Sequence, residues 1–192
     1  MMVTDFELIH THVLKHMGGL DTRLTYHCIE HTLDVIKHST RIALDEGVNE
    51  KETYLLAIAA LYHDTGFLYT YAGHEKRSCE IFIQDTNLFD FTEGEKNIIL
   101  ELIMSTKVPQ LPKNLLQKII CDADLDYLGR NDFTEIAERL RKEFLRYRIV
   151  ANLEDWQNLQ MRFLQKHQYH TNSSRLLREP LKKLNLAGIM AR

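Results

Sequence analysis

Residues that interrupt regular secondary structure are scarce in this sequence of 192 residues. It contains three prolines and eight glycines, and no proline occurs before Pro109. Leucine, isoleucine, glutamate, lysine and arginine, which favour helices or tolerate them well, are frequent. We therefore expect an all-α protein.

Cysteine is also rare, and its three copies lie far apart. Cys28, Cys79 and Cys121 form no CxxC motif, which argues against a disulfide framework and against a zinc site made of cysteines. This usage is typical of a reducing compartment. The first residues show neither the basic start nor the apolar stretch of a signal peptide, so we expect a cytoplasmic protein.

A charge excess and long apolar runs are absent as well. The chain has 24 lysines and arginines against 27 aspartates and glutamates, which gives a net charge of −3. This balance gives no support for nucleic-acid binding driven by bulk electrostatics. No apolar run approaches the roughly 20 residues that a membrane span requires. We expect neither a nucleic-acid polymer nor a membrane among the partners.

Capping residues and glycines divide the chain into segments with helical periodicity. We expect helices over residues 4–17, 26–46, 50–65, 74–84, 93–105, 113–127, 133–150, 153–166 and 172–186. Asn49 and Thr92 are the expected caps of two of them. No internal repeat and no linker rich in proline, glycine or serine interrupts residues 1–192, which favours a single helical domain. Its last 60 or so residues are densely charged and are expected to form an appended layer.

Histidine is plentiful, with ten copies, and its placement is informative. His27, His31, Asp34 and His38 are spaced by four, three and four residues, so on a helix over 26–46 they share one face. A buried apolar face does not need four such residues. Two interpretations are open: a solvated face that is rich in histidine, or a group of ligand side chains.

A second candidate site follows the most apolar helical segment. His63 and Asp64 come directly after this segment, where burial is unfavourable unless both groups have partners. A metal ion would satisfy both side chains. Imidazole and carboxylate ligands suit Mn, Fe, Zn, Co or Ni, whereas Mg prefers oxygen ligands alone.

Three aspartates alternate with apolar residues further along the chain. Residues two apart on a helix do not share a face, so Asp122 and Asp126 should point one way and Asp124 another. One set is expected to be solvated or capping and the other to turn inward. The periodicity alone does not decide which.

Together, His31, His63, Asp64 and Asp124 resemble the ligand pattern of the HD-domain metal-dependent phosphohydrolases. The likeness covers roughly residues 24–186 and includes the segments YHCIEHTLDVI, GHEKRSCE, CDADLDYLG and LRKEF. The chain is most similar to bacterial HD phosphohydrolases of unknown substrate. The resemblance implies an HD-like helical bundle, with a metal-binding core at about residues 24–130 and a C-terminal helical extension at about 131–192.

The resemblance also implies roles for individual residues. It implies that His31, His63, Asp64 and Asp124 hold a divalent metal ion. His27 corresponds to a proton-donating histidine of the phosphodiesterases in this superfamily, so its expected role is that of a catalytic acid. Asp64 is expected to orient the attacking water in addition to binding metal.

Residues beside these motifs are further candidates. His74 is a candidate ligand for a second ion, with Mg left open as that ion, and Glu75 is a candidate supporting acid. Their alternatives are a helix start and a helix-dipole partner. The segment 103–106 lacks a histidine that many relatives have, which favours one tightly held metal, or a second ion held only by water and substrate. Residues proposed to contact phosphate or substrate are Arg77, Lys107, Arg130, His167 and His170.

Each of these five has a plainer interpretation, as a surface cation or as part of a capped helix start. Arg141 and Glu143 are interpreted as a buried ion pair or as solvated charges.

We expect a phosphohydrolase that acts on a small phosphoester through a metal-activated water, with a nucleotide favoured. The alternatives are a cyclic-nucleotide phosphodiesterase, indicated by YHCIEH, and a non-catalytic HD module that senses a nucleotide. The sequence leaves a homodimer open.

Overall fold

The structure, a computed structural model, describes residues 3–191, and their side chains from Phe6 on. The α-helices are α1 (Val3–Met17), α2 (Ile29–Asp45), α3 (Glu50–Tyr62), α4 (His74–Asp85), α5 (Glu93–Ser105), α6 (Leu115–Asp124), α7 (Phe133–Arg146), α8 (Leu153–Lys166) and α9 (Asn172–Met190). Two short 3-10 helices are η1 (Thr65–Leu68) and η2 (Asp126–Gly129). These residues contain no strand, so the all-α prediction is confirmed. Within the same range, no helix is both long and apolar enough to cross a membrane.

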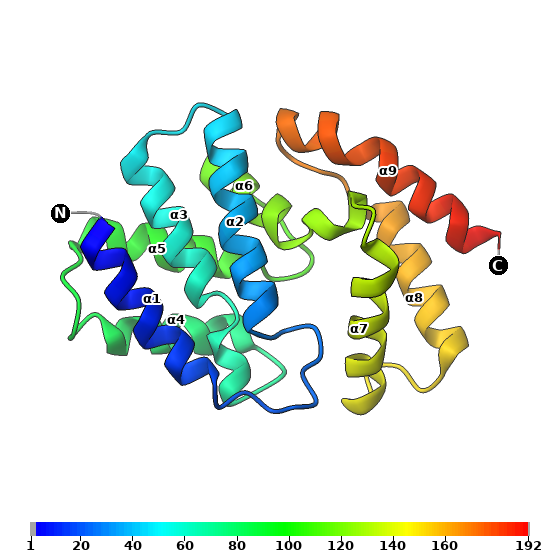
Figure 1. The fold of residues 1–192 in the computed structure, drawn as a ribbon, viewed down its shortest axis with the longest axis horizontal. Helices are drawn as coiled ribbons and strands as arrows, with labels where there is room; N and C mark the ends of the chain where they lie inside the picture. The colour runs from blue at the N-terminus through cyan, green and yellow to red at the C-terminus, as the bar shows by residue number, and fades with distance from the viewer. Residues whose placement is uncertain (1–2, 192) are drawn as a thin grey trace.

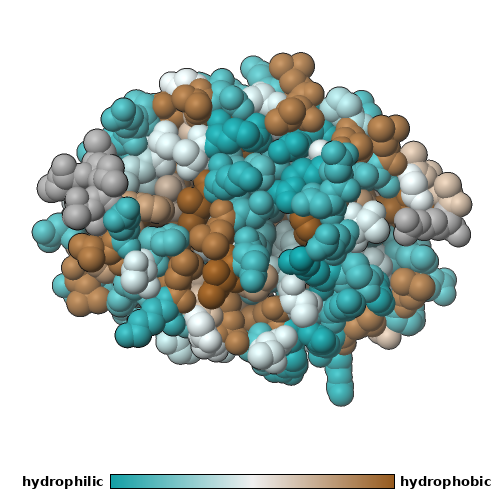
Figure 2. Space-filling model, viewed as in Figure 1, coloured by the Kyte–Doolittle hydropathy of each residue, from teal (hydrophilic) through white to brown (hydrophobic). Residues whose placement is uncertain are grey.

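The helices form two groups that lie side by side (Figure 1). One group contains α1 to α6 and the other α7 to α9, and η2 lies between them. In the first group α2 packs against α3 and α6, whereas α9 packs mainly against η2 and α8. Figure 2 shows no continuous hydrophobic surface across the boundary between the groups on that face. The arrangement is a helical bundle with an appended C-terminal layer, as predicted.

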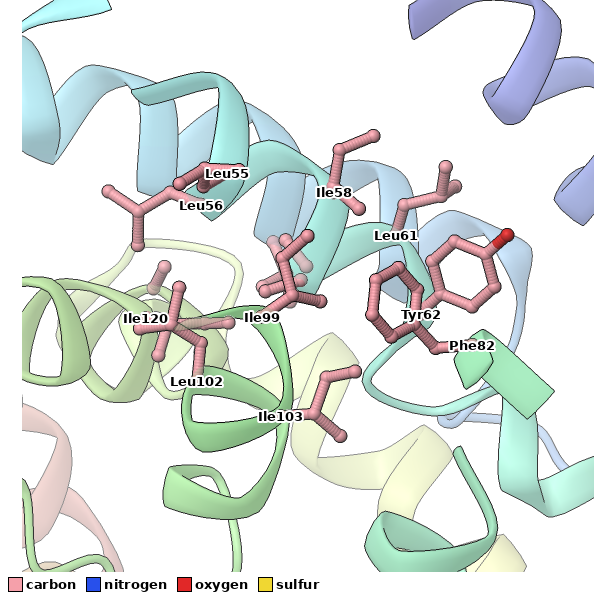
Figure 3. Packing of buried hydrophobic residues seen from close by; sticks show 14 of the residues in the cluster. Leu55, Leu56, Ile58, Leu61, Tyr62, Phe82, Ile99, Leu102, Ile103 and Ile120 are labelled. Atoms are coloured by element: carbon pink, nitrogen blue, oxygen red, sulfur yellow. The ribbon is translucent and has the colours of Figure 1, made fainter. Parts of the chain in front are cut away.

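The first group is built around a helix that is apolar on all sides. Every residue of α3 from Leu55 to Tyr62 is buried. Figure 3 shows its side chains packed against Ile99 of α5 and Ile120 of α6. Because each large buried side chain contributes about 1.5–3 kcal/mol, α3 is a rigid support for the residues that follow it.

A second apolar cluster holds the C-terminal layer in place. It joins Tyr26, Leu125, Tyr127 and Leu128 to Phe133, Ala137, Val150, Trp156 and Leu164. Its first four members belong to the segments that carry candidate metal ligands. The two groups of helices therefore meet at the candidate site.

Two helix starts that local signals predicted, those of α3 and α5, are confirmed. The side chain of Asn49 accepts a hydrogen bond from the backbone N–H of Glu52 over 2.9 Å. Thr92 and Glu95 form a reciprocal capping box at the start of α5. Gly47 has a φ of 72° just after α2, a conformation that glycine adopts without strain.

Five predicted helix boundaries differ from the structure by three or four residues, and two of them, the ends expected at residues 65 and 186, lie at Tyr62 and Met190. The helix expected from residue 26 begins only at Ile29, because a buried carboxylate of Glu143 accepts the backbone N–H groups of Tyr26 and His27 over 2.9 and 3.1 Å. The helix expected over 113–127 ends at Asp124 and continues as the 3-10 turn η2. The helix expected to reach residue 150 ends at Arg146, and Arg148 has a φ of 57°.

Candidate metal centre

The end of α3 holds His63, the first candidate ligand. Its Nδ1 donates a hydrogen bond to the carbonyl oxygen of Ala60 over 2.7 Å, which leaves the lone pair of Nε2 available in the neutral ring. Ser78 of α4 donates to the carbonyl oxygen of His63 over 2.7 Å and accepts from Gly66 N over 2.8 Å. The turn after α3 is therefore fixed against α4.

The side chains of His31 from α2 and Asp124 from α6 converge on Nε2 of His63. Nε2 of His31 lies 3.4 Å from Nε2 of His63 and 3.2 Å from Oδ1 of Asp124. Nε2 of His63 lies 3.7 Å from Oδ1 of Asp124. The ligand atoms of His31, His63 and Asp124 all lie within 4.8 Å of one another, which is close enough for one metal ion to bridge them.

Asp64 lies beside the same two histidines, although outside that triplet. Its Oδ2 is 3.2 Å from Nε2 of His63 and 3.5 Å from Nε2 of His31. This oxygen is buried and has no hydrogen-bond partner among the described residues. Because an unpaired buried carboxylate oxygen is costly, a divalent cation at this point would satisfy it. Two imidazoles and two carboxylates fit such an ion and suit Mn, Fe, Zn, Co or Ni.

The charges at the site support each other. Burial works against the charged form of each group, but the opposite charges beside them outweigh it. Hydrogen bonds with His31 and His63 hold the pKa of Asp124 at about 2. His63 lowers the pKa of Asp64 far below its ordinary range, and the two aspartates raise the pKa of His63. The carboxylates are therefore ionised at neutral pH, as metal ligands must be.

His27 stands next to this cluster, with its ring centroid 6.0 Å from that of His31. Its ring stacks on Phe67, and its Nδ1 donates to Oε1 of Glu143. Tyr71 donates to the same oxygen over 2.9 Å. Burial opposes a charge on His27, but the hydrogen bond with Glu143 and the neighbouring carboxylates raise its pKa. A histidine held in this way is suited to donate a proton.

The role of Glu143 differs from both sequence interpretations. Its side chain is fully buried and pairs with His27, whereas Arg141 pairs with Glu138 at the surface. Gln110 is a second residue that the sequence did not single out, and its amide donates to Oδ2 of Asp124 over 3.1 Å. Glu143 lies in the LRKEF segment, but nothing in the sequence indicates its pairing with His27, and Gln110 lies in no motif.

His74 and Glu75 reach the same site. Nδ1 of His74 donates to the carbonyl oxygen of Tyr71 over 3.2 Å, and its Nε2 is 3.5 Å from Oδ1 of Asp64. The Oε1 atom of Glu75 is 3.7 Å from that nitrogen. His74 is also the first residue of α4, so a helix start and a place at the site are compatible. Its binding of a second ion stays a prediction.

Two cavities open beside the cluster. The larger, of about 540 Å³, is lined by His27, Asp64, Asp124 and His74, and by side chains of α7 and α8. Lys107 lines it as well. The smaller, of about 170 Å³, is lined by His31, Asp124 and Arg130 among others.

Three of the proposed substrate contacts lie elsewhere. Arg77 pairs with Glu80 and covers the ring of Tyr69. His167 and His170 lie in the connection between α8 and α9 and line neither cavity described above.

Arg130 lines the smaller cavity, but its guanidinium already binds the carboxylates of Asp34 and Asp132. The histidine face of α2 is not solvated, since the side chains of His31 and His38 are only 8% and 9% exposed. The solvated interpretation is therefore wrong for these two, and His27 lies outside the helix.

All three alternating aspartates turn inward. Asp122 is fully buried and accepts the backbone N–H groups of His170 and Thr171 over 2.8 Å each. Asp126 is fully buried and accepts from Arg41 and Arg178. Of the expectation that one set would be solvated or capping, only the contact of Asp122 with backbone N–H groups just before α9 remains. Asp126 turns inward because the change from α6 to η2 alters the helical phase.

Comparison with known proteins agrees with this geometry. A family model described as HD domain matches residues 28–126, just over half of the chain. The matched range contains His31, His63, Asp64 and Asp124. Searches of curated proteins and of solved structures gave no match. The chain thus belongs to the HD domain family, a superfamily of metal-dependent phosphohydrolases.

Proposed function

We propose that the protein hydrolyses a phosphoester of a small molecule. One observation carries this proposal: the unpartnered, buried Oδ2 of Asp64 lies beside two imidazole nitrogens at the wall of an open cavity. The neighbouring carboxylate of Asp124 completes a donor set for one divalent cation.

A divalent cation held by His31, His63, Asp64 and Asp124 would supply activation of water and of a phosphoryl oxygen. Lys107, which lines the cavity, offers a positive charge to the phosphoryl group. The other oxygen of Asp64, Oδ1, would orient the attacking water by accepting its hydrogen bond.

His27 supplies the proton that the leaving oxygen needs. Glu143 occupies Nδ1 of His27, so Nε2 is the atom that delivers the proton. Water adds to phosphorus, the bond from phosphorus to the leaving oxygen breaks, and that oxygen takes the proton. The products are an alcohol and phosphate.

Metal content tests the site directly. The wild-type protein, dialysed against Mn²⁺ and then against buffer, should retain about one equivalent by elemental analysis. His63→Ala and Asp64→Ala should lose it, whereas His16→Ala, which removes an exposed histidine of α1, should not. Full retention in both site variants would overturn the ligand assignment.

Phosphate release tests the reaction. With Mn²⁺, the protein should hydrolyse at least one member of a panel of small phosphomonoesters, and His27→Ala should bind metal but lose turnover. Cyclic AMP and cyclic GMP, assayed separately by the formation of AMP and GMP, test the phosphodiesterase alternative. Tight nucleotide binding without turnover under Mn²⁺, Co²⁺, Ni²⁺ or Mg²⁺ would instead identify a sensing module.

A further inference from the structure

The larger cavity has an apolar wall opposite the metal ligands. This wall comes from α7 and α8 and from the segment between them. It includes Leu140, Phe144, Ile149, Trp156, Leu159 and Phe163. All six lie outside residues 28–126, the range of the family match. The C-terminal layer therefore adds an apolar surface beside the candidate metal centre, outside the residues that the HD family model matches.

Several polar side chains in the cavity already have partners. The hydroxyl of Tyr71 donates to Glu143, and that of Thr106 donates to the carbonyl oxygen of Ile103. Among the residues that line the cavity, Lys107 is the only lysine or arginine. A nucleoside diphosphate or triphosphate would need several cations for its phosphates and further polar groups for its base. The lining offers one cation, and on the wall from α7 and α8 only Gln160 and the indole N–H of Trp156 are polar.

We propose that the substrate is a phosphomonoester of an apolar alcohol, with an aryl or alkyl group that binds against α7 and α8. This rests on the proposed function, because the metal centre takes the phosphoryl group. A volume of about 540 Å³ lies within the usual range for a small-molecule site. Hydrolysis breaks the bond between phosphorus and the alcohol oxygen, and water supplies the new oxygen on phosphate.

Binding can be measured without turnover because the chain has a single tryptophan, and Trp156 lines the cavity. The probes are 4-methylphenylphosphonate, 4-butylphenylphosphonate and AMP, each titrated against the protein while tryptophan fluorescence is recorded. Each methylene that leaves water should tighten binding up to about fourfold. We expect the butyl compound to bind at least about tenfold more tightly than the methyl compound, and AMP to bind most weakly.

A pair of variants on α8 separates the cavity from the rest of the helix. Leu159→Gln places an amide in the cavity wall, at a side chain that is 36% exposed and tolerant of change. Leu153→Gln makes the same change on the same helix, outside this cavity. Leu159→Gln should weaken binding of the butyl compound about tenfold, and Leu153→Gln should leave it unchanged.

Turnover separates this inference from the function on which it rests. Two results would contradict the proposal of an apolar substrate: faster hydrolysis of AMP than of 4-butylphenyl phosphate, or hydrolysis rates that do not depend on the length of the alkyl chain. Either result would leave the proposed phosphohydrolase activity intact. If the protein hydrolyses no phosphoester but binds the butyl phosphonate tightly, the proposed hydrolysis is contradicted, whereas the proposed apolar binding site is supported. Equal binding of all three probes would overturn the apolar site directly.

Discussion

At the scale of single residues, three histidines at the site follow one rule. His27, His63 and His74 each use Nδ1 for a hydrogen bond to the protein. Their partners are a carboxylate in the first case and backbone carbonyl oxygens in the other two. The other ring nitrogen is thereby free for a proton or a metal ion. Placement of Nδ1 partners thus determines the chemistry of the site.

Glu143→Gln should impair catalysis by disturbing His27. An amide is a weaker acceptor than a carboxylate, and it no longer favours the protonated ring. We expect kcat to fall about 10- to 100-fold while KM and the bound metal change little. Steady-state kinetics and elemental analysis measure these quantities.

Glu138→Gln is the matched control, because Glu138 lies on the same helix and pairs with Arg141 at the surface. It should leave kcat unchanged. A rise in KM with constant kcat in Glu143→Gln would show that Glu143 supports the fold of the pocket rather than His27.

The residues that could be predicted are those whose chemistry is unusual for their place in the sequence. His63 and Asp64 follow an apolar helix, which made them conspicuous. The partner of Glu143 could not be predicted, since His27 is 116 residues away in the sequence. Gln110 could not be found either, since it lies in a loop and approaches Asp124 only in the folded chain.

At the scale of elements, the approach of α4 to the end of α3 places His74 at the site. A Cβ atom on Gly66 would lie 2.0 Å from the carbonyl oxygen of His74. Only glycine allows the two segments to come this close. The contact also keeps Ser78 in reach of the backbone of His63.

Gly66→Ala should therefore destabilise the protein and the metal centre together. We expect the free energy of unfolding to fall by about 1–3 kcal/mol and the metal affinity to decrease, because backbone atoms of α4 must move. Chemical denaturation and metal titration are the measurements. Gly94→Ala, where a Cβ meets nothing, should be neutral or stabilise by up to about 1 kcal/mol. Equal stability of the two variants would contradict the close contact.

Some helix boundaries are set by residues close in the sequence, and others by residues far away in it. The starts of α3 and α5 depend on Asn49 and Thr92, which act within three residues and could be predicted. The start of α2 depends on a carboxylate from α7, and the sequence placed it three residues too early. Distant contacts of this kind leave no local pattern to read.

At the scale of the whole molecule, Asp126 connects the two groups of helices. Its Oδ1 accepts from Arg41 of α2 over 3.1 Å and from Arg178 of α9 over 2.9 Å. Its other oxygen lies 3.4 Å from Nδ1 of His38. One carboxylate thus balances cationic groups from both sides of the boundary.

Asp126→Ala should loosen this connection, because it leaves partly buried cations without their counter-ion. Arg178 loses its carboxylate partner, and Arg41 keeps only Asp45. We expect a loss of about 3–5 kcal/mol in the free energy of unfolding. Asp132→Ala is the control, since Asp132 is more exposed and pairs with Arg130 near the surface; it should cost less than about 1 kcal/mol. Urea denaturation followed by tryptophan fluorescence compares them, and similar midpoints would contradict a central role for Asp126.

Asp122 has a consequence for how this chain can be divided. It stands two residues before the candidate ligand Asp124, yet its oxygens accept hydrogen bonds from His170 and Thr171, just before α9. Removing the chain from His170 onward would leave a buried carboxylate without partners next to the candidate metal centre. The C-terminal layer consequently cannot be cut away before residue 172, and a graft of this centre onto another scaffold would have to carry residues 170 and 171 with it.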